Sequence, residues 1–145
     1  MSFVDTHGTV LAFDLGLKRT GVASGELSIG VAHPLTVFHA ESTDARLDTI
    51  ARLVAEWHPV VLVLGLPMHA DGGEHEMTRV ARNFARKLES RFGLPVFLVD
   101  ERLTSAAAES ELHARGIHGK KNKALTDAVA AQLILQGFFD ARLIA

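Results

Sequence analysis

The sequence predicts an α/β domain with a mixed β-sheet and helices on its faces. The first forty residues contain short apolar runs separated by turn residues, as in an antiparallel meander. Residues 60–64 and 96–99 are continuous apolar runs, short enough to be strands buried on both faces, with parallel neighbours. Helical spacing fills the segments between and after them. The order β-β-β-α-β-α-β-α-α therefore indicates a mixed sheet covered by helices.

The first three predicted strands surround tight turns. Residues 10–13 form an apolar run that ends in Asp14, and a second run follows at residues 22–23. Residues 29–39 form a third extended segment. Pro34 within it favours an edge strand or a bulge, because proline cannot donate a hydrogen bond to a central ladder.

Helices are predicted from apolar residues that recur every three to four positions. The first follows suitable caps at residues 42–44, and its apolar face comprises Leu47, Ile50, Ala51, Val54 and Trp57. The second has an apolar stripe opposite a solvated line of arginines and ends at Gly93. Its stripe comprises Met77, Val80, Ala81, Phe84 and Leu88, and its arginines are Arg79, Arg82 and Arg86. An alanine-rich helix, capped by Thr104 or Ser105, should end near Gly116, and the last should span residues 122–138.

The composition is that of a globular protein and excludes several classes. Residues 1–145 contain no linker or repeat, which predicts one domain. With 48% hydrophobic residues and no apolar run near 18 residues, the chain should not span a membrane. The absence of cysteine excludes disulfides and thiolate zinc sites, and the first residues do not resemble a secretory signal. We therefore expect a cytoplasmic protein. Its net charge of −2 means that any nucleic acid must be bound by local basic patches.

Three acidic residues lie where predicted elements begin or end. Asp14 ends the first strand, Glu101 follows the strand at 96–99, and Asp127 lies on an otherwise apolar face of the last helix. That face also carries Ala130, Ala131 and Ile134, and the two alanines should let the helix lie close to the sheet. If the fold brings the acids together, oxygen ligands without clustered His or Cys suit a Mg²⁺ or Mn²⁺ site for phosphate chemistry.

Each acid also has a structural interpretation. Asp14 is suited to begin a turn by bonding its own loop. Glu101 is equally suited to a loop ion pair with Arg102. Asp100 competes with Glu101 for the site, because alternation sends neighbouring strand side chains to opposite faces. Asp127 in the first turns of a helix is favoured by the helix dipole.

Other motifs fail on spacing. Gly16 and Gly21 fit a phosphate loop, but Val22 stands where that loop requires lysine. Lys18 stands where a dinucleotide fingerprint requires glycine. The zinc-protease signature that begins at residue 75 has Arg79 in place of its second histidine.

Four segments resemble a known family. They are residues 11–23 (LAFDLGLKRTGVA), Gly65-Leu66-Pro67 with Asp71-Gly72, residues 100–105 (DERLTS), and Asp127 with Ala130 and Ala131. In this order they resemble the YqgF family of bacterial RNase H-like proteins, described as Holliday-junction resolvase homologues and as pre-16S ribosomal RNA nucleases. The resemblance covers nearly the full chain. It implies a mixed five-stranded RNase H-like sheet, with three antiparallel strands and then two parallel ones, flanked by helices.

The resemblance also implies a catalytic site. It makes Asp14, Glu101 and Asp127 an acidic triad that is both catalytic and metal-binding, and it favours Glu101 over Asp100. Such a site would bind one or two Mg²⁺ or Mn²⁺ ions and hydrolyse a phosphodiester bond in line. A fourth ligand is not evident in the sequence.

Basic residues near these acids are candidates for contacts with nucleic acid, although each is also suited to a solvated surface. They are Lys18, Arg19, Arg102, Lys120, Lys121 and Lys123. The three lysines cluster within four residues before the helix that carries Asp127, as phosphate binding requires. Aromatic residues make up only 6% of the chain, which favours structured or duplex nucleic acid over stacked single strands.

The function that the resemblance implies is a metal-dependent endonuclease in 5′-end processing of precursor 16S rRNA during ribosome biogenesis. One alternative is a resolvase of branched DNA, whose two symmetric nicks favour a homodimer. Another is a non-catalytic nucleic-acid-binding module that associates with the ribosome. A sugar-kinase-like ATPase shares the Asp-x-Gly turn but needs two such domains.

Overall fold

A computed structural model of the chain describes residues 7–67, 73, 76–101 and 123–144, with five strands in one sheet. The strands are β1 (Thr9–Leu15), β2 (Arg19–Glu26), β3 (Ala32–His39), β4 (Val61–Leu66) and β5 (Val96–Asp100). Their order across the sheet is β3-β2-β1-β4-β5. The first three strands are antiparallel, and β4 lies parallel to both β1 and β5. This topology confirms the predicted mixed sheet.

Strand β3 is an edge strand with an irregular register, as proline predicted. Pro34 pairs with Ala23, and the register shifts between Val22 and Ala23. Because proline has no N–H to donate, a position beside a bulge on an outer strand leaves the ladder of β1 and β2 intact.

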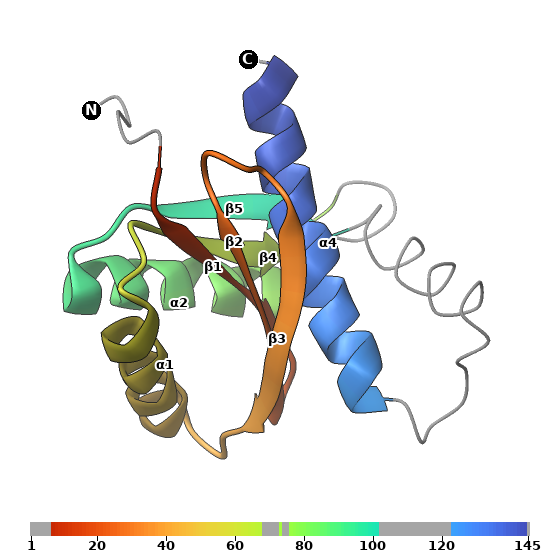
Figure 1. The fold of residues 1–145 in the computed structure, drawn as a ribbon. Coiled ribbons are helices and arrows are strands. Elements are labelled where there is room, and N and C mark those ends of the chain that lie inside the picture. The colour runs from red at the N-terminus through yellow and green to blue at the C-terminus, as the bar shows by residue number, and fades with distance from the viewer. Residues whose placement is uncertain (1–6, 68–72, 74–75, 102–122, 145) are drawn as a thin grey trace.

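Helices cover both faces of the sheet (Figure 1). One face packs against α1 (Thr43–Trp57) and α2 (Glu76–Phe92), and the other packs against α4 (Lys123–Ile144). Alternate residues of β1 point into the two cores, with Leu11 and Phe13 towards α1 and α2, and Val10 and Ala12 towards α4. Both central parallel strands are therefore buried on both sides, which explains their continuous apolar runs.

Local signals predicted the start of α1 and the end of α2. The Ser42 side chain accepts a hydrogen bond from the Ala45 N–H at 3.1 Å and caps α1. Helix α2 ends at Gly93, whose φ of 65° is a left-handed conformation that favours glycine. The predicted arginine line of α2 is exposed, as expected.

Three sequence predictions were wrong where burial depends on neighbours. Val80 is exposed, because the buried face of α2 runs through Thr78 and Ala85 instead. Strand β5 is not buried on both faces, because it is the outer strand of the sheet and Phe97 and Leu98 are exposed. The last helix continues beyond residue 138, since Phe139 is buried against the sheet at Gly25.

The alanine-rich helix predicted between residues 104 and 116 lies outside the described residues. None of the helices that the structure describes is long and apolar enough to cross a membrane.

Candidate active site

Asp14 and Glu101 meet at one end of the sheet although they belong to non-neighbouring strands. Asp14 is near the end of β1, and Glu101 directly follows β5, with β4 between them. The Glu101 N–H donates to the Leu66 carbonyl at 3.1 Å, which extends the β4–β5 ladder by one residue. The Glu101 side chain is hydrogen-bonded to Asp14. It passes over Gly65 of β4, where a Cβ atom would lie 2.8 Å from the Glu101 Cδ.

The pair holds a proton. The pKa of Glu101 is raised to about 9, first by burial and then by the hydrogen bond to Asp14 and the nearby charges of Asp14 and Asp100. At neutral pH Glu101 is therefore protonated and donates to the Asp14 carboxylate. Asp100 lies exposed on the sheet edge. The structure thus turns Glu101, not Asp100, towards Asp14, a choice that strand alternation left open.

Asp127 approaches the same end of the sheet from helix α4. Its Oδ2 lies 3.2 Å from the Arg19 Nε, and the two side chains are 21% and 30% exposed, respectively. The α4 backbone passes so close to β2 that a Cβ atom at Gly21 would lie 2.1 Å from the Asp127 carbonyl oxygen. Gly21 is the register partner of Asp14. The close approach predicted from the helix alanines is confirmed for Ala131, which is fully buried, but it depends equally on Gly21.

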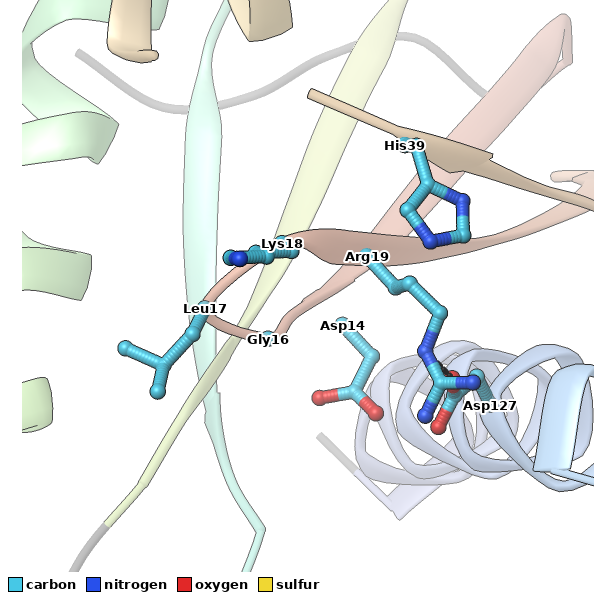
Figure 2. A pocket seen from close by; sticks show the side chains of 7 residues that line it. All are labelled: Asp14, Gly16, Leu17, Lys18, Arg19, His39 and Asp127. Atoms are coloured by element: carbon cyan, nitrogen blue, oxygen red, sulfur yellow. Dashed lines mark ion pairs between the residues drawn. The ribbon is translucent and has the colours of Figure 1, made fainter. Parts of the chain in front are cut away.

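An open pocket of about 490 Å³ joins these groups (Figure 2). Its lining comprises Asp14, Gly16, Leu17, Lys18, Arg19, His39 and Asp127. Two of the predicted acids and two of the predicted cations, Lys18 and Arg19, therefore share one pocket. The sequence interpretation missed His39, which arrives because its register partner on β2 is Arg19. The only indication of His39 is the pairing of the end of β3 with the start of β2, which a single sequence segment does not reveal.

The three acids form a hydrogen-bonded pair and a neighbour rather than one cluster. Among the described residues, no three His, Asp or Glu side chains are arranged closely enough to hold a metal ion. Asp127 is paired with Arg19, and Glu101 with Asp14. The donor chemistry nevertheless fits a hard divalent cation, because a partly buried carboxylate pair that must hold a proton is stabilised by a cation in place of that proton. Arg102, Lys120 and Lys121 lie outside the described residues, as does the side chain of Lys123.

Comparison with solved structures identifies the class of fold. The fold is similar to that of T. thermophilus RuvC in complex with a Holliday junction substrate, with a TM-score of 0.63, 20% identity, and coverage of 96% of this chain and 98% of that chain. It is also similar to the Fowlpox virus resolvase bound to Holliday junction DNA, with a TM-score of 0.58, 12% identity, and coverage of 93% and 99%. The chain therefore has the RNase H-like fold of the RuvC-type resolvases.

Sequence comparison narrows the class to a family. The chain belongs to the RuvX (YqgF) family, described as Holliday junction resolvase, whose model matches residues 8–141. A relative from Thiobacillus denitrificans, named "Putative pre-16S rRNA nuclease", is 81% identical over the full length of both chains. A relative of the same name from Dechloromonas aromatica is 58% identical over 92% of each chain. The family expected from the sequence motifs is confirmed.

Proposed function

We propose that this protein is an endonuclease that hydrolyses phosphodiester bonds in precursor 16S rRNA, at its 5′ end, during ribosome biogenesis. The partly buried Asp14–Glu101 pair beside a pocket with Lys18 and Arg19 carries the proposal. A raised carboxyl pKa and two acidic side chains in contact lower stability at neutral pH, and such arrangements concentrate at functional sites. Family membership and the names of the relatives support the same activity. A precursor-rRNA substrate places the proposed activity in the cytoplasm, in association with the assembling ribosome.

Asp14, Glu101 and Asp127 would hold one or two Mg²⁺ or Mn²⁺ ions. Such an ion, when bound, supplies a Lewis acid for the phosphoryl oxygen and lowers the pKa of water. To act as ligands, Glu101 must release its proton and Asp127 must exchange its contact with Arg19. Arg19 would then be available to a substrate phosphate in the same pocket.

The basic residues of the pocket bind the nucleic-acid backbone in this proposal. Lys18 and Arg19 line the same pocket as Asp14 and Asp127. They neutralise phosphates without reading sequence, so they orient the strand over Asp14 and Glu101. We assign the remaining cations predicted from the sequence, Arg102 and the lysines at 120, 121 and 123, to other phosphates of the bound strand.

A cleavage assay tests the proposal. Purified protein with Mg²⁺ or Mn²⁺ should cut labelled precursor 16S rRNA, and Asp14→Asn and Glu101→Gln should each lower the rate at least a hundredfold. Asp48→Asn is a matched control, because Asp48 is an exposed acid on α1 paired with Arg91. Cleavage at the wild-type rate by Asp14→Asn would refute the site.

Branched DNA is the alternative substrate that a specific observation favours, because the chain shares its fold with resolvases solved on Holliday junctions. Paired nicks require two active sites, so this alternative predicts a homodimer on the junction. A four-way junction in the same assay, with the mass of the complex measured, separates the two substrates. Tight binding by the wild type without cleavage of either would favour a non-catalytic assembly module.

A further inference from the structure

The turn between β1 and β2 holds a large apolar side chain in solvent. Leu17 is 83% exposed, the highest value among the exposed large hydrophobic residues of the described chain. It lines the same pocket as Asp14 and Lys18, and it projects from the turn on the side away from Asp127 (Figure 2). A single exposed leucine is common on protein surfaces, so exposure alone says little. The construction of the turn is more informative.

Backbone hydrogen bonds fix both ends of the turn. The Gly16 N–H donates to the Arg19 carbonyl at 2.7 Å, and a Cβ atom at residue 16 would lie 2.8 Å from that carbonyl oxygen. The Ala40 N–H donates to the Lys18 carbonyl at 2.9 Å and fixes the turn to the end of β3. Residues 16–19 are therefore held in one backbone conformation.

A buried arginine holds the tip of the turn. Arg46 of α1 is 7% exposed, and its Nη2 donates to the Gly16 carbonyl at 2.9 Å and to the Leu17 carbonyl at 3.1 Å. Burial lowers the pKa of Arg46, and its Nε has no hydrogen-bond partner among the described residues. A buried guanidinium that meets only carbonyl oxygens costs folding free energy. Arg46 therefore fixes the conformation of a turn that faces solvent. This arrangement lowers the stability of the fold but holds the turn ready to bind a ligand.

We propose that Leu17 contacts nucleic acid and that Arg46 is its positioning residue. Leu17 packs against the base or sugar of a nucleotide that flanks the one at Asp14 and Glu101, while the adjacent Lys18 meets its phosphate. This inference rests on the proposed nuclease function. Apolar side chains such as leucine insert between bases in other nucleic-acid complexes, and a prefixed turn loses little conformational entropy on binding.

Leu17→Ala tests the contact, with Ile29→Ala as the matched control. Ile29 is 71% exposed in the turn after β2, at the opposite end of the sheet. Affinity for a precursor 16S rRNA fragment is measured by fluorescence anisotropy in EDTA, with 2-aminopurine near the cleavage site as a stacking probe. Leu17→Ala should weaken binding about tenfold, as loss of a buried leucine contact predicts. It should also abolish the change in 2-aminopurine emission that occurs when the wild type binds the RNA. Ile29→Ala should match the wild type. Wild-type affinity and emission for Leu17→Ala, or equal losses in both variants, would overturn the proposal.

The positioning role of Arg46 is tested by variants of Arg46 alone and in combination with Leu17→Ala. Arg46→Met keeps the aliphatic volume but removes the donors, and should raise KM about fivefold or more with a smaller change in kcat. Arg46→Lys, which keeps a donor, should recover part of that loss. The double variant Leu17→Ala/Arg46→Met should bind no more weakly than the weaker single variant, whereas a purely structural role gives losses that multiply. Thermal unfolding checks each variant, and if Arg46→Met does not fold, the Leu17→Ala result still decides.

The two levels of inference fail separately. A wild-type protein that neither binds nor cleaves rRNA or branched DNA would refute the proposed function together with this contact. An active wild type whose Leu17→Ala variant is unchanged would refute only the contact.

Discussion

Glu101 reaches Asp14 across an intervening strand because residue 65 is glycine. The side chain of Glu101 passes over β4 at the one position where no Cβ atom blocks it. The carboxyl group thereby becomes partly buried and forms a hydrogen bond with Asp14. A backbone position without chemistry of its own thus decides which acids can act together.

Gly65→Ala should disable the site with limited damage to the fold. The new methyl group would lie 2.8 Å from the Glu101 Cδ and 2.6 Å from the Ile134 Cδ1, so Glu101 must move. Overpacking of this kind costs about 1–3 kcal/mol of unfolding free energy, and displacing a carboxylate should lower the cleavage rate at least tenfold. Urea unfolding and single-turnover cleavage measure the two effects. Gly137→Ala in α4 is the control, because a Cβ atom at residue 137 would lie 3.6 Å from Val99 Cγ1, an ordinary van der Waals distance. A fully active Gly65→Ala would contradict the role given to this glycine.

Gly21→Ala should be much more damaging, because its Cβ atom would lie 2.1 Å from the backbone oxygen of Asp127. Backbone cannot rotate out of the way as a side chain can, so α4 must move away from β2. We expect a loss of about 3 kcal/mol or more in unfolding free energy and a lower affinity for Mn²⁺ in calorimetry. Stability equal to that of the wild type would show that α4 does not pack as closely as the structure places it.

The metal-free protein should lose stability as pH rises from about 5 towards 9. Glu101 has a folded-state pKa of about 9 against an ordinary value of 4.5, so between these values the folded state holds a proton that the unfolded state has lost. The stabilisation that this proton gives to the folded state is complete below pH 4.5. The free energy of unfolding then declines by up to about 1.4 kcal/mol per pH unit as pH rises towards 9. Urea unfolding in EDTA at several pH values measures this slope. Glu101→Gln should flatten it, and parallel profiles for the two proteins would contradict the assigned cause.

Arg19→Met should separate metal binding from substrate binding. Removal of the guanidinium leaves Asp127 without the cation now 3.2 Å from its Oδ2, so affinity for Mn²⁺ should rise severalfold in calorimetry without nucleic acid. Affinity for rRNA should fall several-fold at low salt, with a shallower salt dependence. Because the pair is partly exposed, stability should change by no more than about 1 kcal/mol. Arg52→Met on α1 is a control for the loss of an arginine outside the pocket. Unchanged affinity for Mn²⁺ would show that Arg19 does not oppose the metal.

Much of the fold could be predicted because its signals are local. Turn glycines, the Ser42 cap, the break at Gly93 and the helical spacing of α1 each depend on a few neighbouring residues. Pro34 predicted an edge strand because proline has no N–H for a central ladder, which is a property of the residue itself. The exposure of Val80 was predicted wrongly, since it depends on the rotation of α2 against the sheet.

The order of the described elements, the family, and the candidate acids and cations could be predicted from the sequence, with Asp14 and Lys18 in one short motif. Which of these groups come into contact became evident from the folded structure. The hydrogen bond between Glu101 and Asp14, the contact of Arg19 with Asp127, and the hydrogen bonds from Arg46 to the β1–β2 turn all join segments distant in sequence. The physical reason is that sheet order, strand register and the close helix approach at Gly21 set these distances, and none of them is encoded in the spacing of a single segment.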